Sequence, residues 1–441
     1  MNLRLGKIIL INLLIFIFLY TFLFIIYPSN SSYFECNEFV KNNILKSNIS
    51  YYVPVSCDQE LYLAGVYDFQ SIYKYDYNYQ TRPLYILTLK MFYEILNVFL
   101  SNSLIHKFLS FTLSHILIIS IAGKVFLDSL LKLRINLDTK KIISILFFLS
   151  LSPIVKWGVF DSAHQTLTVL QFSLSFYFIT YQFSEYKKIY LFSFILGVLA
   201  LSNMTFALPL LFLVLHKLKS INEILLNFHR LLFSFVLFVT PVLTWNVFIS
   251  FMGYDPYNAA FEYWHQFIWV KDFLLAGYEN VNFNQENSEY YCMSIPIFLK
   301  CYLVDFYKTA IYLSVLIVLC LVNFKNINDK SINLHKDVLL KLFLIFSVSF
   351  IFWSFIGWYP PLRFNLYSFG SFLTLLFCLQ FALLNDGRVK TISILSYVLY
   401  FISLNHWNYL GVIKINPGIL LATFLVSLNI FETFYRQKIS T

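Results

Sequence analysis

Charged residues are scarce in this chain. Only 12% of its 441 residues are Asp, Glu, Lys or Arg, about half the fraction that is typical of a soluble domain. Hydrophobic residues make up 59% of the chain, and the mean hydropathy is +0.68. This shortage of charge excludes an ordinary water-soluble protein and predicts a chain that folds in a lipid bilayer.

Repeats and low-complexity segments are also missing. The absence of an internal repeat argues against transporters that are built from two inverted halves. The net charge is +9, which in a soluble protein would suggest a nucleic-acid partner. Here the basic residues fall in alternate short loops, as the positive-inside rule describes. We therefore expect no nucleic-acid partner and a single integral-membrane domain over residues 1–441.

Apolar stretches long enough to cross a bilayer, or nearly so, recur along the chain. About 20 apolar helical residues span the ~30 Å hydrocarbon core. The stretches are 8–27, 108–131, 142–157, 165–182, 189–202, 204–216, 231–251, 306–324, 338–358, 364–384, 391–404 and 410–433. They predict an all-α polytopic membrane protein with about twelve transmembrane helices. No small-residue cleavage site follows the first stretch, which favours a membrane anchor over a signal peptide.

The charges of the loops give a test of this topology. If the N-terminus is cytoplasmic, every predicted cytoplasmic loop is basic, and the two long loops, 28–107 and 252–305, lie outside. The basic residues are Lys132, Arg134, Lys140, Lys141, Lys187, Lys188, Lys217, Lys219, Arg230, Lys325, Lys330, Lys336, Lys341, Arg388, Lys390, Arg436 and Lys438. We expect a bacterial inner-membrane protein with both termini in the cytoplasm. The endoplasmic reticulum membrane is the alternative, and Asn30 and Asn48 would then be glycosylation acceptors.

Two segments are ambiguous. Residues 84–100 are hydrophobic, but counting them as a span would move basic loops outside. We expect them to form an amphipathic helix at the outer interface, with Lys90 and Glu94 as an i,i+4 ion pair. The stretches 189–202 and 204–216 are either a broken hairpin or one long helix.

The cysteines agree with this topology. Cys36 and Cys57 share the first outer loop, and Cys292 and Cys301 share the second. Each pair is either a disulfide or two free thiols, because connectivity cannot be read from the sequence. Cys320 and Cys378 lie within predicted spans, where we expect them to be small apolar core residues.

Two polar motifs stand out in the first outer loop. They are Asp58-Gln-Glu-Leu-Tyr62 and, about twenty residues later, Thr81-Arg-Pro-Leu-Tyr85. Ionisable groups held against a membrane cost free energy and tend to mark functional sites. These motifs are therefore the main sequence evidence for a function.

The order of these motifs resembles the GT-C superfamily of integral-membrane glycosyltransferases, in particular its aminoarabinose transferase and protein mannosyltransferase branch. Gln59 stands where the family pattern has Glu, and Arg82 is followed by one proline instead of two. Further segments similar to the family are Ser152-Pro153, Asp161, 191–206 (with Asn203 where a Lys is common) and 358–364. The resemblance implies a polyprenyl-phosphate-linked sugar as donor and an acceptor lipid, glycan or protein at the outer face.

Such a transfer needs a carboxylate base for the acceptor hydroxyl and cationic help for the departing phosphate. Asp58 is the candidate base, with Glu60 as the alternative and Asp161 in an assisting role. Arg82 and Arg363 are the candidate phosphate ligands, and Tyr62 and Trp264 are candidate substrate-binding residues. Asp161 and His164 are candidate ligands of a divalent metal ion.

Each of these residues also has a structural interpretation. Asp58 and Glu60 can be solvated loop acids, and Asp161 can cap the helix that follows it. His164 can be an interfacial side chain, and the arginines can anchor to lipid headgroups. Trp264 belongs to a cluster of aromatic residues that an interfacial belt explains.

The sequence favours a glycosyltransferase. The enzyme alternative is a polysaccharide polymerase or ligase, but the outer loops contain few arginines beyond Arg82 and Arg363. A lipid-linked oligosaccharide flippase or other transporter would have charged residues along its spans, and these spans are nearly uncharged. A structural membrane subunit is the remaining alternative.

Overall fold

The fold is all-helical wherever this computed structural model describes it. The described residues are 4–26, 62, 65–66, 72–73, 80, 82–99, 103–155, 166–183, 185–215, 221–256, 303, 306–307, 309–310, 313–327, 329–356 and 366–403. No strand occurs among them, which confirms the all-α prediction. The α-helices are α1 (Leu5–Ile26), α3 (Pro83–Phe99), α4 (Ser103–Lys132), α5 (Thr139–Ser150), α7 (Thr166–Tyr181), α8 (Tyr186–Ala200), α9 (Ala207–Leu215), α10 (Ile221–Phe251), α14 (Ser314–Lys325), α15 (Asp329–Ile356), α17 (Ser371–Leu383) and α18 (Gly387–Ser403). A short 3-10 helix, η4 (Met204–Phe206), precedes α9, and a π-helical turn, η7 (Leu366–Gly370), precedes α17.

The apolar stretches coincide with helices wherever they fall on described residues; 410–433 lies outside them. Two helical segments are long and apolar enough to cross a membrane, Leu109–Lys132 and Asn227–Phe251, with 24 and 25 residues. Shorter apolar helices include Leu167–Tyr181, Ser314–Lys325 and Tyr367–Leu383. The two long segments support a membrane protein, and the count of about twelve spans stays a prediction.

The structure shows which helices the two ambiguous segments form. Residues 83–99 form the helix α3, and its Lys90 and Glu94 side chains lie 3.5 Å apart as the predicted ion pair. The helix α8 ends at Ala200, and the chain continues through an extended Asn203, whose side chain caps the amide of Thr205. An Asn side chain caps a new helix in this way, so the two stretches are separate helices.

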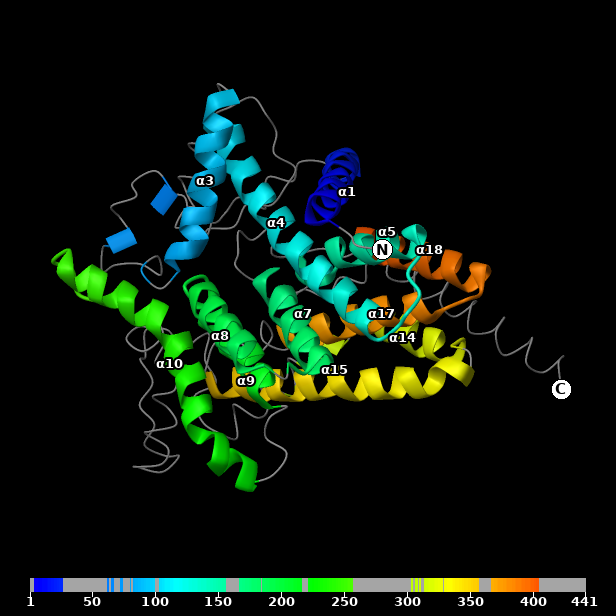
Figure 1. The fold of residues 1–441 in the computed structure, drawn as a ribbon. Coiled ribbons are helices and arrows are strands. Elements are labelled where there is room, and N and C mark those ends of the chain that lie inside the picture. The colour runs from blue at the N-terminus through cyan, green and yellow to red at the C-terminus, as the bar shows by residue number, and fades with distance from the viewer. Residues whose placement is uncertain are drawn as a thin grey trace. The chain divides into compact units, whose positions relative to one another are not determined.

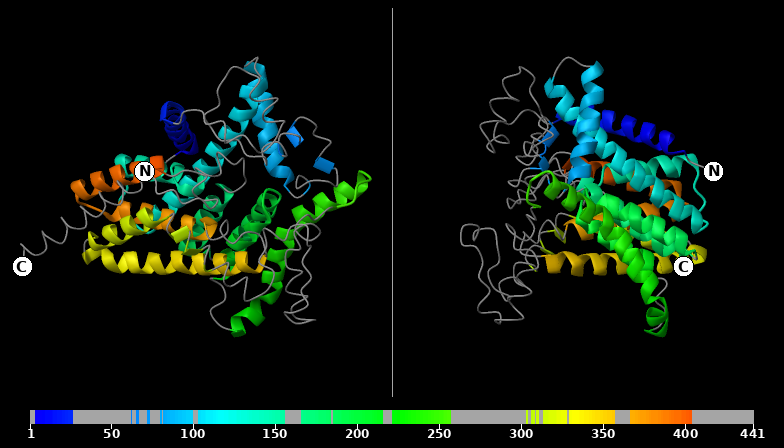
Figure 2. Two further views of the ribbon diagram at one scale, coloured as in Figure 1. Left: turned by 180° about the vertical axis from the view of Figure 1, so that it is seen from behind. Right: turned by 60° about the vertical axis from the view of Figure 1, so that its left-hand side comes forward.

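The chain divides into two compact units. Unit 1 comprises Met1–Ser129 and Val155–Glu262, and unit 2 comprises Leu130–Ile154 and Tyr263–Thr441. In unit 1, α8 and α10 lie side by side, and α9 packs against both α7 and α8 (Figure 1). In unit 2, α17 packs against α5, α14 and α15 (Figure 2). Whether the chain acts as one membrane domain stays a prediction.

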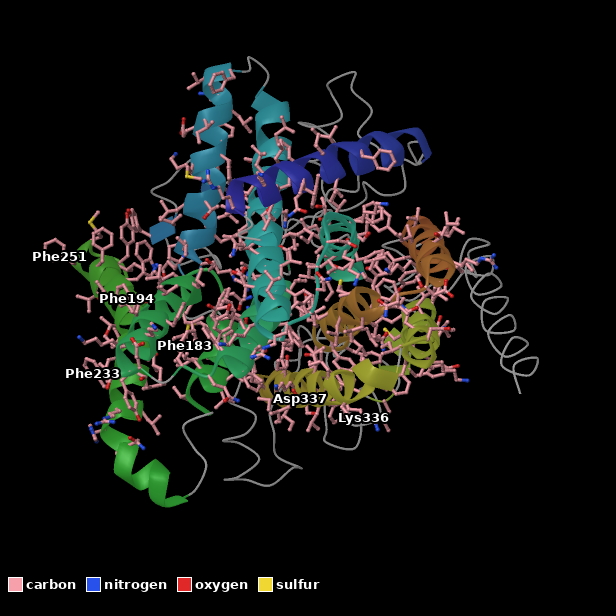
Figure 3. The ribbon with its side chains drawn as sticks, turned by 45° about the vertical axis from the view of Figure 1, so that its right-hand side comes forward. Phe183, Phe194, Phe233, Phe251, Lys336 and Asp337 are labelled. Atoms are coloured by element: carbon pink, nitrogen blue, oxygen red, sulfur yellow. The ribbon has the colours of Figure 1, made fainter. Side chains whose placement is uncertain are left out.

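The helices α8 and α10 run parallel. Tyr186, at the start of α8, lies under the Arg230 guanidinium, 4.4 Å from the ring centroid. One turn later Tyr190 meets Phe233 with ring centroids 4.9 Å apart. Contacts therefore advance in the same direction along both helices, toward the end of α10 that carries Phe251 (Figure 3).

The helices α4 and α7 are also parallel. His115, near the middle of α4, and Thr166, at the start of α7, form a hydrogen bond of 2.8 Å. Further along, the rings of Phe126 and Phe176 lie 5.7 Å apart. These contacts are buried, so α4 and α7 form the inner part of unit 1.

Unit 2 is organised around α17, whose residues are all buried. It runs antiparallel to α15, because the Ser349 hydroxyl bonds that of Ser368 at 2.9 Å, just before α17, and His335 contacts Gln380 at 3.2 Å near its end. Cys378 in α17 is a buried free thiol, as is Cys320 in α14. This confirms their prediction as core residues, whereas the other four cysteines lie outside the described residues.

A glycine sets the distance between α8 and α10. A Cβ added at Gly197 would overlap the backbone carbonyl of Phe238. Backbone atoms cannot move aside as a flexible side chain can, so this crossing requires glycine.

We expect Gly197→Ala to destabilise the protein by about 1–3 kcal/mol, the usual cost of overpacking a close contact. The measurement is the thermal unfolding midpoint in detergent. Gly6→Ala is the control, because a Cβ at Gly6 meets nothing within 4 Å and Ala favours a helix. Equal midpoints for the two variants would contradict the assigned crossing.

Candidate functional site

The two polar motifs of the predicted outer loop 28–107 meet in unit 1. The Arg82 guanidinium donates a hydrogen bond from Nη1 to the Tyr62 hydroxyl. The Tyr62 ring packs edge-on against Tyr85, with centroids 5.2 Å apart and planes at 86°. Both tyrosines are buried. Residues twenty positions apart in the chain therefore form one cluster around the arginine.

Local sequence explains where Arg82 lies. Pro83 is the first residue of α3, a position that suits proline because its fixed φ is helical and its missing N–H has no helical partner. The amide of Leu84 donates to the carbonyl of Leu201 at 3.2 Å, which joins the start of α3 to the end of α8. Arg82 is thereby held at the N-terminus of a 17-residue helix.

Residues that precede α3 in the chain also pack on its side. Lys90 donates to the carbonyl of Val66 at 3.2 Å. A Cβ at Gly65 would lie 3.2 Å from the Ile86 side chain, so this part of the loop lies directly on the helix. These contacts keep the segment that contains Tyr62 against α3.

A second set of contacts joins the same loop to the end of α10. The buried Gln80 side chain donates to the carbonyls of Tyr73 and Asp255. The backbone carbonyl of Gln80 accepts from the Trp245 indole at 2.7 Å. Gln80, two residues before Arg82, is therefore in contact with Tyr73, with the helix α10 and with the residues just after α10.

Two sources of positive charge lie next to each other at the start of α3. The N-terminus of α3 carries the positive end of the helix dipole, and Arg82 adds a full positive charge next to it. Burial raises the pKa of Tyr85 well above its ordinary value, and the nearby Tyr62 adds to this, while Arg82 opposes it. Tyr85 therefore stays neutral near pH 7.

Polar side chains continue from this site between α4, α7 and η4. Gln171 donates to the Thr205 hydroxyl, which donates to Asn203 Oδ1 at 2.7 Å. His115 bonds Thr166 through Nδ1, and its Nε2 and the Gln171 Oε1 are buried without a hydrogen-bond partner. Buried polar groups usually have partners. The two atoms without partners are therefore an unusual feature of this otherwise apolar interior.

The structure describes two of the predicted site residues, Tyr62 and Arg82, and brings them into contact. The others lie outside the described residues: Asp58, Glu60, Asp161, His164, Trp264 and Arg363. No group of three potential metal ligands occurs in the described part of the chain. The sequence did not identify Gln80, Tyr73 or Trp245, because their contacts use backbone carbonyls and leave no residue pattern.

No protein-family model matches the chain, and no curated protein or solved structure matches it either. The function is therefore argued from the motifs and from the contacts around Arg82.

We expect Tyr62→Phe to destabilise this site. The variant keeps the ring contact with Tyr85 but removes the acceptor of a hydrogen bond from a charged group, a bond worth about 1.5–3 kcal/mol. The thermal unfolding midpoint in detergent measures the loss. Tyr254→Phe is the matched control, because Tyr254 is more exposed and contributes its ring to Tyr73. A Tyr62→Phe midpoint as high as that of the control would rule out the assigned role of the hydroxyl.

Proposed function

We propose that the protein is a GT-C-like glycosyltransferase that takes a sugar from a polyprenyl-phosphate donor at the outer face of a membrane. The acceptor is a lipid, a glycan or a protein. The observation that carries the proposal is the contact of the two motifs: Arg82 is fixed at the N-terminus of α3 by Tyr62. A helix N-terminus with an arginine beside it is a suitable site for a phosphate group.

The arrangement of unit 1 supports the predicted topology. The loop segments expected outside come together at one end of the unit, where Leu84 meets Leu201 and Gln80 meets Asp255. At the other end, Arg230 lies over Tyr186, and Lys188 pairs with Glu185 at 2.9 Å. This end contains residues expected to be cytoplasmic.

Helix directions agree with the same topology. The charge pattern predicts that α8 and α10 both run outward and that α4 and α7 both run inward. Each of these pairs is parallel in unit 1. In unit 2, α15 and α17 are expected to run in opposite directions, and their contacts are antiparallel. These directions are those expected for the predicted polytopic topology of about twelve spans.

Exposed apolar surface supports a position of α3 at the membrane interface. One face of α3 is buried through Tyr85, Ile86 and Leu89. A second stripe is apolar and exposed, formed by Leu87, Met91, Ile95 and Val98. Only 17% of the long apolar window of α10 is buried. In this arrangement, a donor whose isoprenoid tail lies in the bilayer presents its phosphate to Arg82 at the membrane interface.

In the proposed reaction, the acceptor oxygen attacks the anomeric carbon while the bond from that carbon to the phosphate oxygen breaks. Asp58, or Glu60 next to it, takes the proton of the acceptor hydroxyl. Arg82, aided by Arg363, stabilises the charge on the departing polyprenyl phosphate. Tyr62 orients the planar guanidinium, and Trp264 offers an aromatic face to the sugar. Asp161 assists, and with His164 it would hold any divalent ion.

We expect Arg82→Ala to lower the rate of sugar transfer about 100-fold or more, the usual effect of removing one donor that stabilises transition-state charge. Arg82→Lys should retain part of the rate, because a lysine keeps the charge but not the planar geometry. The assay follows consumption of labelled polyprenyl-phosphate sugars by the purified protein in nanodiscs.

Arg388→Ala is the control, because Arg388 is an exposed arginine of the second unit. Asp58→Asn and Asp161→Asn, assayed alongside, test the two carboxylates. Full turnover by Arg82→Ala and Asp58→Asn at normal expression would refute the proposed site.

We expect cysteines introduced at exposed positions to report the membrane orientation of unit 1. In a background without the native cysteines, Asp255→Cys should react with a membrane-impermeant maleimide on intact cells. Lys188→Cys should react only after permeabilisation, since the two positions lie at opposite ends of the unit. Labelling of Lys188→Cys but not of Asp255→Cys on intact cells would reverse the topology.

A further inference from the structure

Gln80 makes an unusual set of hydrogen bonds for a loop residue. It is 2% exposed. Its Nε2 donates to Tyr73, earlier in the same loop, and to Asp255, 3.2 Å away and just beyond α10. Its backbone carbonyl accepts from the indole of Trp245 in α10. One residue thus joins two outer loop segments to the end of a helix.

Only a side-chain amide fits this position well. The NH₂ group of glutamine supplies two donors, and here both bonds go to backbone carbonyls. A carboxylate would place an acceptor against two acceptors, and an aliphatic side chain would leave both carbonyls without this donor. Buried carbonyls without partners are costly. The Gln80 side chain therefore stabilises the positions of both Tyr73 and Asp255.

Aromatic packing stabilises the same arrangement. The Tyr73 ring lies 6.0 Å from Trp245, 5.9 Å from Phe248 and 6.1 Å from Tyr254. These are normal distances for interacting aromatic pairs. The rings come from the first outer loop and from the end of α10, so they reinforce the link that Gln80 makes.

Arg82 therefore lies between two anchors. On one side is Gln80, at most about 7 Å away along the chain and fixed to the end of α10. On the other side is the first turn of α3, fixed to α8 through Leu84 and Leu201. Pro83 restricts the backbone between them. The position of the guanidinium is thus set by both helices.

We propose that Gln80 is a positioning residue that holds Arg82 where it binds the phosphate of the donor. This inference rests on the proposed function. Gln80 acts through Arg82, and its loss weakens binding of the phosphate without changing binding of the isoprenoid tail.

The test is a double-mutant cycle on the full-length protein, with farnesyl phosphate as the probe and farnesol as the control without phosphate. Gln80→Leu lowers the affinity for farnesyl phosphate about tenfold, which corresponds to the loss of roughly one hydrogen-bond interaction. Arg82→Ala lowers it further. Gln80→Leu has no additional effect in the Arg82→Ala background, because both changes act on one interaction. Farnesol binds all variants equally.

Trp245→Phe provides a second variant if Gln80→Leu folds poorly. It keeps the aromatic packing but removes the indole donor to Gln80, and it causes a smaller loss of affinity that also vanishes in the Arg82→Ala background. Wild-type protein that binds farnesyl phosphate no better than farnesol overturns the proposed function and the role of Gln80 with it. If the wild-type protein binds farnesyl phosphate, two results overturn the role of Gln80 alone. One is that the variants bind the probe as well as the wild type. The other is that they lose the same affinity when Arg82 is already replaced by alanine.

Discussion

The contact between the Arg82 guanidinium and the Tyr62 hydroxyl is the interaction on which the candidate site depends. An arginine at the start of a helix lies next to the positive end of the helix dipole, which is unfavourable for a cation. Oxygen acceptors around the guanidinium offset this cost. Tyr62 supplies one such acceptor and is buried against Tyr85. The same contact fixes the end of the Asp58-Gln-Glu-Leu-Tyr62 motif next to α3. The segment that contains Tyr62 therefore reaches α3 next to Arg82, the residue proposed to bind the phosphate of the donor.

The position of this contact is determined by packing deeper in unit 1. The start of α3 is bonded to Leu201 at the end of α8, and Gln80 is bonded to segments at the end of α10. The helices that carry these two anchors, α8 and α10, approach closely at Gly197. Association through small residues is the usual way for helices to pack in a bilayer, where the hydrophobic effect does not drive them together.

Much of this fold was predictable, since helix positions follow from the lengths of the apolar stretches and from interruptions such as Asn203. The amphipathic character of α3 was predictable from Lys90 and Glu94. The contact between Tyr62 and Arg82 was suggested only by their presence in two neighbouring motifs. The role of Gln80 was not predictable, because its partners are the carbonyls of Tyr73 and Asp255, which every residue possesses. Gly197 gave no signal of its own either, since a glycine in an apolar helix indicates close packing only when its neighbour is known.

The charges at the start of α3 indicate what kind of group would be stabilised there. The dipole of α3 and the charge of Arg82 both favour an anion. The pKa of Tyr85 is raised chiefly by burial, so this residue does not supply a negative charge near pH 7. An anionic group at the N-terminus of α3 would therefore gain from both positive sources at once. At a membrane surface, where the effective dielectric constant is below that of water, this gain is larger than in solution. In the proposed function, the phosphate of the polyprenyl donor is this anion, because its isoprenoid tail stays in the bilayer.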